Sequence, residues 1–220
     1  MPSNPRLPAA TVGDINKLLK QYTTRSPTDT EDPLPGVIFN VVDRLGNSLV
    51  CAGDGPRDVT IPDVSIDEKT VLLMGSLTKL VTVIATLIIV ERGLIGLDDW
   101  ETLYKLVPEL AEKKILKGFD ANEEPILEEV PASAPKISLR LLLANISGFG
   151  TSFFSEDLWE FFEKDIWHDD IWGGWEAMVK MPLINVPGEK WNYGVSSDLS
   201  MRLTENVIAS SQSKSEPRLG

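Results

Sequence analysis

The sequence predicts an α+β protein, with strands near the N-terminus and helices over most of the remainder. In residues 36–53 a strand pattern, a turn and a second strand pattern follow one another, which predicts a β-hairpin. The run 80–90 is almost continuously apolar and too long for a typical strand, and Gly93 closes it, which favours a helix. Because helical patterns dominate from there on, the predicted strands are confined to the first part of the chain.

Composition is ordinary for a globular protein, but the charge is not. The 220 residues are 42% hydrophobic and 25% charged, with a net charge of −12. That length holds one large domain or two small ones. An acidic chain gains nothing from the release of phosphate counterions, so the charge disfavours nucleic-acid binding. The 11 residues of 80–90 are too few to span a bilayer, so we expect a buried core helix and no membrane span.

Cysteine usage and the first residues bear on the compartment. Cys51 is the one cysteine, which excludes an internal disulfide and fits a reducing environment. We expect its side chain to be a small buried apolar group. The start of the chain is polar, and no apolar segment typical of a signal peptide follows it. These features predict a cytoplasmic protein.

The remaining segments are predicted from local patterns. Residues 1–10 contain three prolines and are expected to form a disordered lead-in, followed by an amphipathic helix over 11–22. Residues 54–70 are polar and irregular. Residues 118–136 are acidic and rich in proline, which predicts an exposed connection. Residues 209–220 are small and polar and are expected to be a tail without helix or strand.

Residues 153–176 combine four tryptophans with many carboxylates. Two interpretations stay open: a helix-rich segment that packs its aromatic rings on the core, which we favour, or the wall of an apolar ligand pocket. His168 lies in this segment and is the one histidine. A metal site needs more nitrogen or sulfur donors than this, so we expect His168 at the surface and no metal.

The chemistry of the chain is concentrated at Ser76 and Lys79, three residues apart at the start of the predicted helix. That spacing places both side chains on one face. A serine hydroxyl is a weak nucleophile that needs a base, and a lysine amine can serve when burial disfavours its charged form. The helix N-terminus adds free N–H groups for a developing oxyanion. The alternative is that Ser76 only caps the helix and Lys79 is solvated.

Four segments, in this order, resemble a known family. They are GSLTK (75–79) with the apolar run after it, ERGLIGLDD (91–99), ISLRLLLANISG (137–148) and PGEKWNY (187–193). Together they resemble the serine β-lactamase-related superfamily, in the branch of class C β-lactamases, penicillin-binding-protein-like esterases and fungal transesterases of the lovastatin acyltransferase type. The resemblance covers roughly residues 11–208.

The resemblance implies a role for each matching residue. Ser76 would be the acylated nucleophile and Lys79 its base partner, and the Ser76 N–H would be one oxyanion donor. Tyr193 would match the tyrosine of the second motif, which moves the proton between nucleophile, leaving group and acceptor. Without that match, Tyr193 would be a loop aromatic packed on the core. The segment Ser147–Gly148 would be a structural turn.

Three departures from the family pattern matter. Val195 stands where penicillin-recognising members carry the asparagine of Tyr-x-Asn, which favours an esterase or transesterase. Residues 145–148 read Asn-Ile-Ser-Gly where the family often has His-Thr-Ser-Gly. The third motif, Lys-Thr-Gly or His-x-Gly, has no counterpart after residue 208, so the sequence predicts a C-terminally truncated member whose antiparallel sheet is incomplete.

The resemblance therefore implies a β-lactamase/transpeptidase-like fold. Residues 11–208 would be the N-terminal portion of one domain, with an α/β part over 11–75 and a mainly helical part over 76–208. We expect an acyl-enzyme on Ser76 that passes the acyl group to water or an alcohol. Small esters, thioesters or amides would be substrates, an acyl carrier is a candidate donor, and no cofactor is implied. The alternative is an inactive remnant or a binding module.

Overall fold

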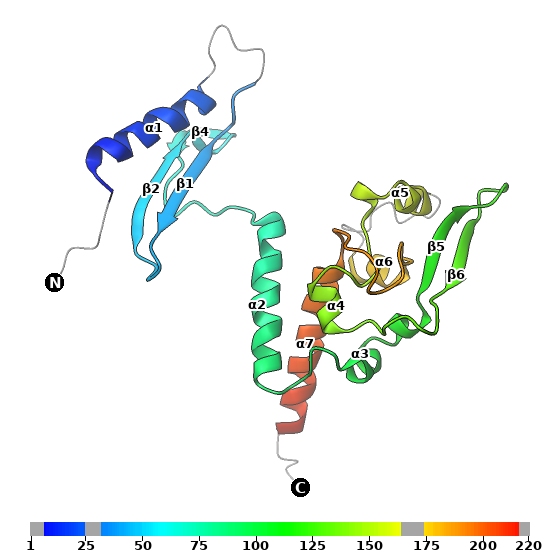
Figure 1. Cartoon of the computed structure of the whole chain (residues 1–220). Coiled ribbons are helices and arrows are strands. Elements are labelled where there is room, and N and C mark those ends of the chain that lie inside the picture. The colour runs from blue at the N-terminus through cyan, green and yellow to red at the C-terminus, as the bar shows by residue number, and fades with distance from the viewer. Residues whose placement is uncertain (1–6, 25–31, 164–173, 216–220) are drawn as a thin grey trace. The chain divides into compact units, whose positions relative to one another are not determined.

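The computed structural model describes residues 7–24, 32–163 and 174–215. The chain divides into two compact units, Met1–Leu73 and Met74–Gly220 (Figure 1). Each described unit combines helices with antiparallel strand pairs, so the predicted α+β class is confirmed.

The first unit is a helix and two hairpins. Its elements are α1 (Ala9–Thr23), β1 (Val37–Val42), β2 (Ser48–Asp54), β3 (Pro56–Asp58) and β4 (Ile61–Ser65). The predicted hairpin is β1–β2, with Val37 opposite Asp54. Its turn is closed by the Asp43 carboxylate, which accepts from the Leu45 and Asn47 N–H groups. Helix α1 extends into the segment expected as the lead-in, since it begins at Ala9.

Cys51 is exposed, so the expectation of a buried thiol is wrong. Successive side chains of a strand point to opposite faces. In β2 the buried residues are Val50 and Ala52, on either side of Cys51. Since α1 contacts β2, the alternation puts Cys51 on the other face of the strand from the two buried residues.

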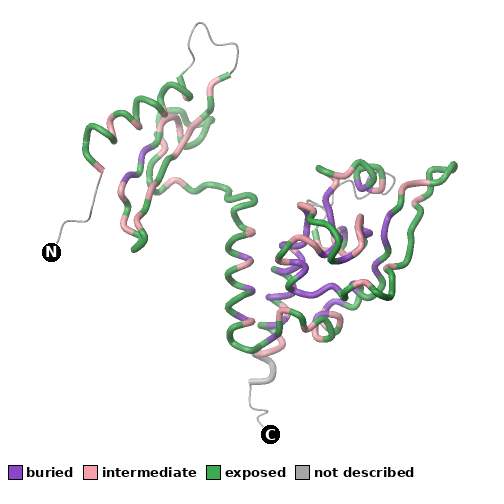
Figure 2. Tube along the Cα trace, in the orientation of Figure 1, coloured by how far each residue is buried: buried purple, intermediate pink, exposed green. Residues whose placement is uncertain are grey.

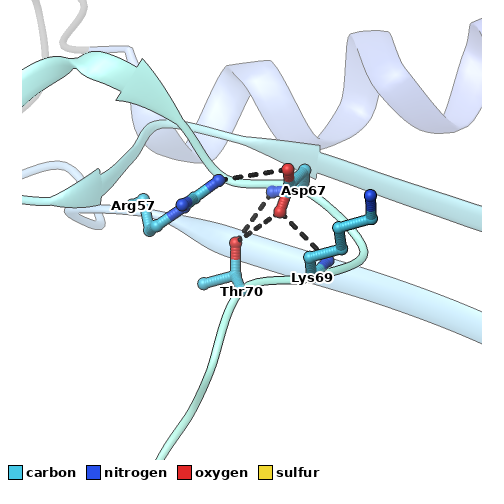
Figure 3. A network of polar contacts seen from close by, with 4 residues as sticks. All are labelled: Arg57, Asp67, Lys69 and Thr70. Carbon is cyan, nitrogen blue, oxygen red and sulfur yellow. Dashed lines mark hydrogen bonds and ion pairs between the residues drawn. The ribbon is translucent and has the colours of Figure 1, made fainter.

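Residues 54–70 are more ordered than their polarity suggested. Strands β3 and β4 pair across a short turn in which the Asp58 carboxylate accepts from the Thr60 N–H. After β4, Asp67 accepts from Arg57, from the Lys69 N–H and from the Thr70 hydroxyl (Figure 3). Partial desolvation opposes ionisation, but these hydrogen bonds and the Arg57 charge together hold the pKa of Asp67 below its ordinary value.

The second unit carries the predicted chemistry. Its elements are η1 (Gly75–Leu77), α2 (Thr78–Glu91), α3 (Trp100–Leu106), η2 (Pro108–Glu112), β5 (Lys114–Phe119), β6 (Pro125–Glu129), α4 (Leu139–Leu143), η3 (Ser152–Phe154), α5 (Glu156–Glu163), α6 (Gly174–Lys180) and α7 (Ser196–Ser215). The core is built from apolar residues of most of these elements, with Leu103, Leu142 and Leu199 among the most buried.

Helix α2 forms where predicted, but it is not buried all round, so the expectation of a core helix is wrong. Its buried residues are Thr82, Thr86 and Ile89 (Figure 2). Thr86 contacts Thr204 on α7, which lies beside α2 (Figure 1). Apolar residues at helical spacing on another face stay exposed: Leu80 is 65%, Ile84 51% and Leu87 43% exposed. Because nearly every position is apolar, periodicity alone could not indicate which face is buried.

Residues 118–136 were expected as an exposed connection, but part of this segment pairs as the hairpin β5–β6. The turn forms because the Asp120 carboxylate accepts from the Asn122 and Glu124 N–H groups. Lys114 on β5 pairs with Glu129 on β6 at 2.7 Å, which offsets the acidic charge that suggested a loop.

Helix α7 continues to Ser215, so residues 209–215 are helical rather than part of a polar tail. The Ser210 hydroxyl donates to the Val207 carbonyl and the Ser211 hydroxyl to the Ile208 carbonyl, within the helix itself. Among the helices in the described ranges, none has both the length and the apolar character that crossing a membrane requires.

Candidate active site

Ser76 lies in the short turn η1 that leads into α2. Gly75 before it has φ +52°, a left-handed conformation that favours glycine. Leu77 is the residue that precedes α2, and no side chain caps the helix there. The Ser76 hydroxyl instead accepts a hydrogen bond from the Tyr193 hydroxyl at 2.6 Å. The simple capping alternative therefore does not describe Ser76.

Tyr193 lies in a loop that is hydrogen-bonded through its backbone to residues 145–150. The Asn192 N–H donates to the Asn145 carbonyl at 2.9 Å, and the Gly188 N–H donates to the Ile146 carbonyl at 2.7 Å. Next to Tyr193, Gly194 lies so close to Gly150 that a Cβ atom would come within 2.4 Å of the Gly150 oxygen. A side chain at position 194 is thus excluded by backbone, which fixes the approach of the loop that carries Tyr193.

Ser147 and Gly148 are structural, as the resemblance implied. The Ser147 hydroxyl shares a buried 2.9 Å hydrogen bond with the Ser196 hydroxyl at the start of α7. Gly148 has φ +92°, and a Cβ atom there would meet the Asn185 carbonyl at 2.4 Å. Both residues join the segment after α4 to the loop that precedes α7.

Lys79 reaches the same place from the first turn of α2. Its ammonium lies 5.1 Å from the centre of the Tyr193 ring, within range of a cation–π interaction. It also lies 3.3 Å from the Asp198 carboxylate. The structure therefore brings together the three residues predicted from the sequence, Ser76, Lys79 and Tyr193.

Asp198 is a member of this cluster that the sequence reasoning missed. It lies in the first turn of α7, five residues after Tyr193. An acidic residue in a first helical turn is common because it interacts favourably with the helix dipole, so its position alone did not single it out. Val195 takes no part in the cluster, since its side chain is in the core and only 2% exposed.

An apolar groove of about 470 Å³ adjoins the hydroxyl pair. Phe154, Trp191, Asn192 and Tyr193 line it. Phe154 meets the Tyr193 ring edge-on, with ring centres 5.7 Å apart. Since Tyr193 both lines this groove and contacts Ser76, a group bound to Ser76 Oγ would begin beside aromatic rings.

Of the four tryptophans in residues 153–176, the two in the described ranges, Trp159 and Trp175, do not line this groove. Trp159 is exposed on α5, and Trp175 packs against the core with Arg202 over its ring. Of these two, the core-packing interpretation is right for Trp175 and not for Trp159. Phe154, from the same segment, lines the groove as the ligand-wall alternative proposed, together with Trp191 from outside the segment. Trp167, His168 and Trp172 lie outside the described residues.

Comparison with known proteins identifies the family of the chain. Residues 30–211 match the family described as Beta-lactamase. The chain belongs to the beta-lactamase family. The family predicted from the four ordered segments is therefore confirmed, and so is the fold that it implied.

Within the beta-lactamase family, the chain is similar to fungal acyltransferases and esterases. It is 34% identical over 180 residues to the acyltransferase mokF of Monascus pilosus, a match that covers 79% of this chain and 42% of that protein. It is 36% identical over 177 residues to a lovastatin esterase of Penicillium rubens, covering 78% of this chain and 42% of that protein. The chain thus spans less than half the length of these relatives.

Solved structures agree with this placement. The structure of unliganded simvastatin synthase of Aspergillus terreus matches this chain with a TM-score of 0.66 and 28% identity. The match covers 92% of this chain and 50% of the synthase. The hydrolase EstCE1 matches with a TM-score of 0.60 at 15% identity, which supports the fold alone.

Proposed function

We propose that this chain carries the nucleophile and the proton-transfer residues of an acyl-transferring serine hydrolase. The observation that carries the proposal is the 2.6 Å hydrogen bond between Tyr193 and Ser76, with the Lys79 ammonium 5.1 Å from the tyrosine ring. A nucleophile in hydrogen-bond reach of an acid–base group, which is itself oriented by a third group, is the usual arrangement for covalent catalysis.

In the proposed reaction, Ser76 Oγ forms a bond to the carbonyl carbon of an ester or thioester. The Ser76 proton passes through Tyr193 to the leaving group as the bond to that group breaks. Water or an alcohol then attacks the acyl-enzyme and releases Ser76. The Ser76 N–H, at the start of a helical segment, is a candidate donor to the oxyanion in both steps.

The apolar groove supports small esters of an apolar acyl group as substrates. One relative is named a methylbutanoyltransferase, which fits a short branched acyl chain. The Ser76–Tyr193 contact is exposed, so an acyl group attached to a carrier protein could also reach it. We therefore propose acyl-carrier thioesters as a second, larger kind of acyl donor. The single cysteine supports a cytoplasmic location as part of the same proposal.

A binding module without turnover is the second candidate. It is favoured by the exposed apolar residues Leu80, Ile84 and Leu87 on α2, because such a patch often marks a protein contact. This candidate predicts a folded chain whose Ser76 is unreactive.

Intact-mass spectrometry of the chain after exposure to p-nitrophenyl butanoate separates the two candidates. Acylation should add one butanoyl group and map to Ser76. The Ser76→Ala variant should not be labelled, and Tyr193→Phe should be labelled about 10²–10⁴ times more slowly, the usual contribution of an acid–base group. Ser65→Ala, at an exposed serine on β4, is the matched control and should be labelled at the normal rate. Equal labelling of Ser76→Ala and the unmodified chain would refute the proposal.

A further inference from the structure

The helices α2 and α7 run in the same direction and bring their N-terminal ends together. A buried hydrogen bond of 2.8 Å joins Thr86 on α2 to Thr204 on α7. Lys79 lies seven residues before Thr86, and Asp198 lies six residues before Thr204. At 1.5 Å of rise per residue, these offsets are about 10 Å and about 9 Å along the two helices. The Lys79–Asp198 pair therefore belongs to the same interface, about two turns nearer the N-terminal ends.

The position of Lys79 is electrostatically unfavourable on its own. Helix N-termini carry partial positive charge, so a cation in the first turn is disfavoured. Lys79 is in the first turn of α2, which contains no acidic residue. Asp198 is the acidic residue in the first turn of α7, and its carboxylate lies 3.3 Å from the Lys79 ammonium. The Asp198 carboxylate thus lies where it interacts favourably both with the Lys79 ammonium and with the positive N-terminal ends of the two helices.

Val195, two residues after Tyr193, cannot be the polar partner of the Lys79 ammonium. It has no polar side-chain atom, and it packs in the core. The asparagine amide that the family pattern would supply there is absent, and the polar partner of Lys79 is instead Asp198.

We infer that Asp198 is a positioning residue for acyl transfer. Its carboxylate holds the Lys79 ammonium beside the Tyr193 ring. There the ammonium stabilises the negative charge that develops on the phenolic oxygen as Tyr193 gives its own proton to the leaving group and takes the Ser76 proton in its place. Asp198 touches neither the nucleophile nor the acyl group in this scheme and acts through Lys79. The inference rests on the proposed function, and it adds a fourth member to the three residues predicted from the sequence.

The test compares Asp198→Asn, Asp198→Ala and Asp198→Glu with a matched control, Asp157→Asn. Asp157 is an exposed acidic residue in the first turn of α5, so its loss removes a similar interaction with a helix N-terminus far along the sequence from Ser76. Thermal unfolding followed by circular dichroism establishes that each variant is folded.

With p-nitrophenyl butanoate, Asp198→Asn should lower kcat by roughly 10–100-fold and change KM by less than about twofold, because a group that aids only proton transfer affects the chemical step. Asp198→Glu should recover most of the rate, and Asp157→Asn should match the unmodified chain. A raised KM with an unchanged kcat, or equal losses in Asp198→Asn and Asp157→Asn, would overturn the inference.

A second measurement does not depend on turnover. Acetic anhydride modifies free lysine amines, and the Lys79 side chain is 25% exposed, so the reagent can reach it. Asp198→Asn should accelerate the modification of Lys79 severalfold relative to the exposed Lys105, as followed by peptide mass spectrometry. An unchanged Lys79 rate would overturn the inference. A folded, unmodified chain that p-nitrophenyl butanoate does not label would overturn the proposed function and the role of Asp198 with it.

Discussion

Replacing Gly194 with alanine should damage both the fold and the candidate site. A Cβ atom at position 194 would lie 2.4 Å from the Gly150 carbonyl oxygen, 2.6 Å from its carbonyl carbon and 2.8 Å from its Cα. All three are backbone atoms, so no side chain can move aside. Since ordinary contacts begin near 3.4 Å, the two segments must separate by about 1 Å.

The expected magnitudes follow from that displacement. Overpacking of this kind costs about 1–3 kcal/mol of unfolding free energy. Tyr193 is the neighbouring residue, so a shift of about 1 Å lengthens its 2.6 Å contact with Ser76 to beyond hydrogen-bond range. A misplacement of about 1 Å can lower the rate of a positioned reaction roughly 10²-fold.

The assay combines urea unfolding with the rate of Ser76 acylation by p-nitrophenyl butanoate. Gly96→Ala is the control, because a Cβ atom there would have its closest neighbour at an ordinary 3.5 Å. We expect Gly96→Ala to be nearly neutral in both measurements. If Gly194→Ala and Gly96→Ala had the same unfolding free energy and the same acylation rate, the steric reasoning would be refuted.

Two further predictions concern a buried lysine and the groove. Burial lowers the pKa of Lys113 to about 8, against the raising effect of Glu109. Between pH 8 and the ordinary lysine value the unfolded chain binds more protons, so unfolding free energy should rise with pH across that window, by about 3 kcal/mol in total. Urea unfolding from pH 7 to 10.5 checks this, and Lys113→Met should lose that rise; an identical rise in the variant would contradict the assignment. In the groove, Trp191→Ala should lower kcat/KM for p-nitrophenyl hexanoate about 5–10-fold more than for the acetate, because the longer chain loses apolar contact. Trp159→Ala, at an exposed tryptophan outside the groove, is the control, and equal losses for both esters in Trp191→Ala would argue against acyl binding there.

Local patterns predicted the β1–β2 hairpin, helix α2 and the family, because these depend on short-range periodicity and on residue order. They failed for residues 118–136 and 54–70, where acidic and polar composition suggested loops. In both places, aspartate side chains accept hydrogen bonds from nearby N–H groups and shape the turns of hairpins. Composition counts charges but does not register these local bonds.

The prediction for Cys51 failed for a related reason. A cysteine is often buried, but strand alternation decides which face it takes, and that depends on which side of β2 contacts α1. The extent of α7 was also underestimated, since serine-rich residues 209–211 have little apolar character although they continue the helix.

By itself, the sequence predicted Ser76 as the nucleophile and Lys79 as its partner, because their three-residue spacing at a helix start depends only on helical geometry. Order along the chain identified Tyr193 through its motif. Tertiary structure alone decided that Asp198, 119 residues after Lys79, completes the cluster, and that Phe154 and Trp191 flank Tyr193. The physical reason is that these contacts arise where α2 packs against α7 and where the loop after α6 folds onto residues 145–150, and no periodicity records which distant helix ends will meet.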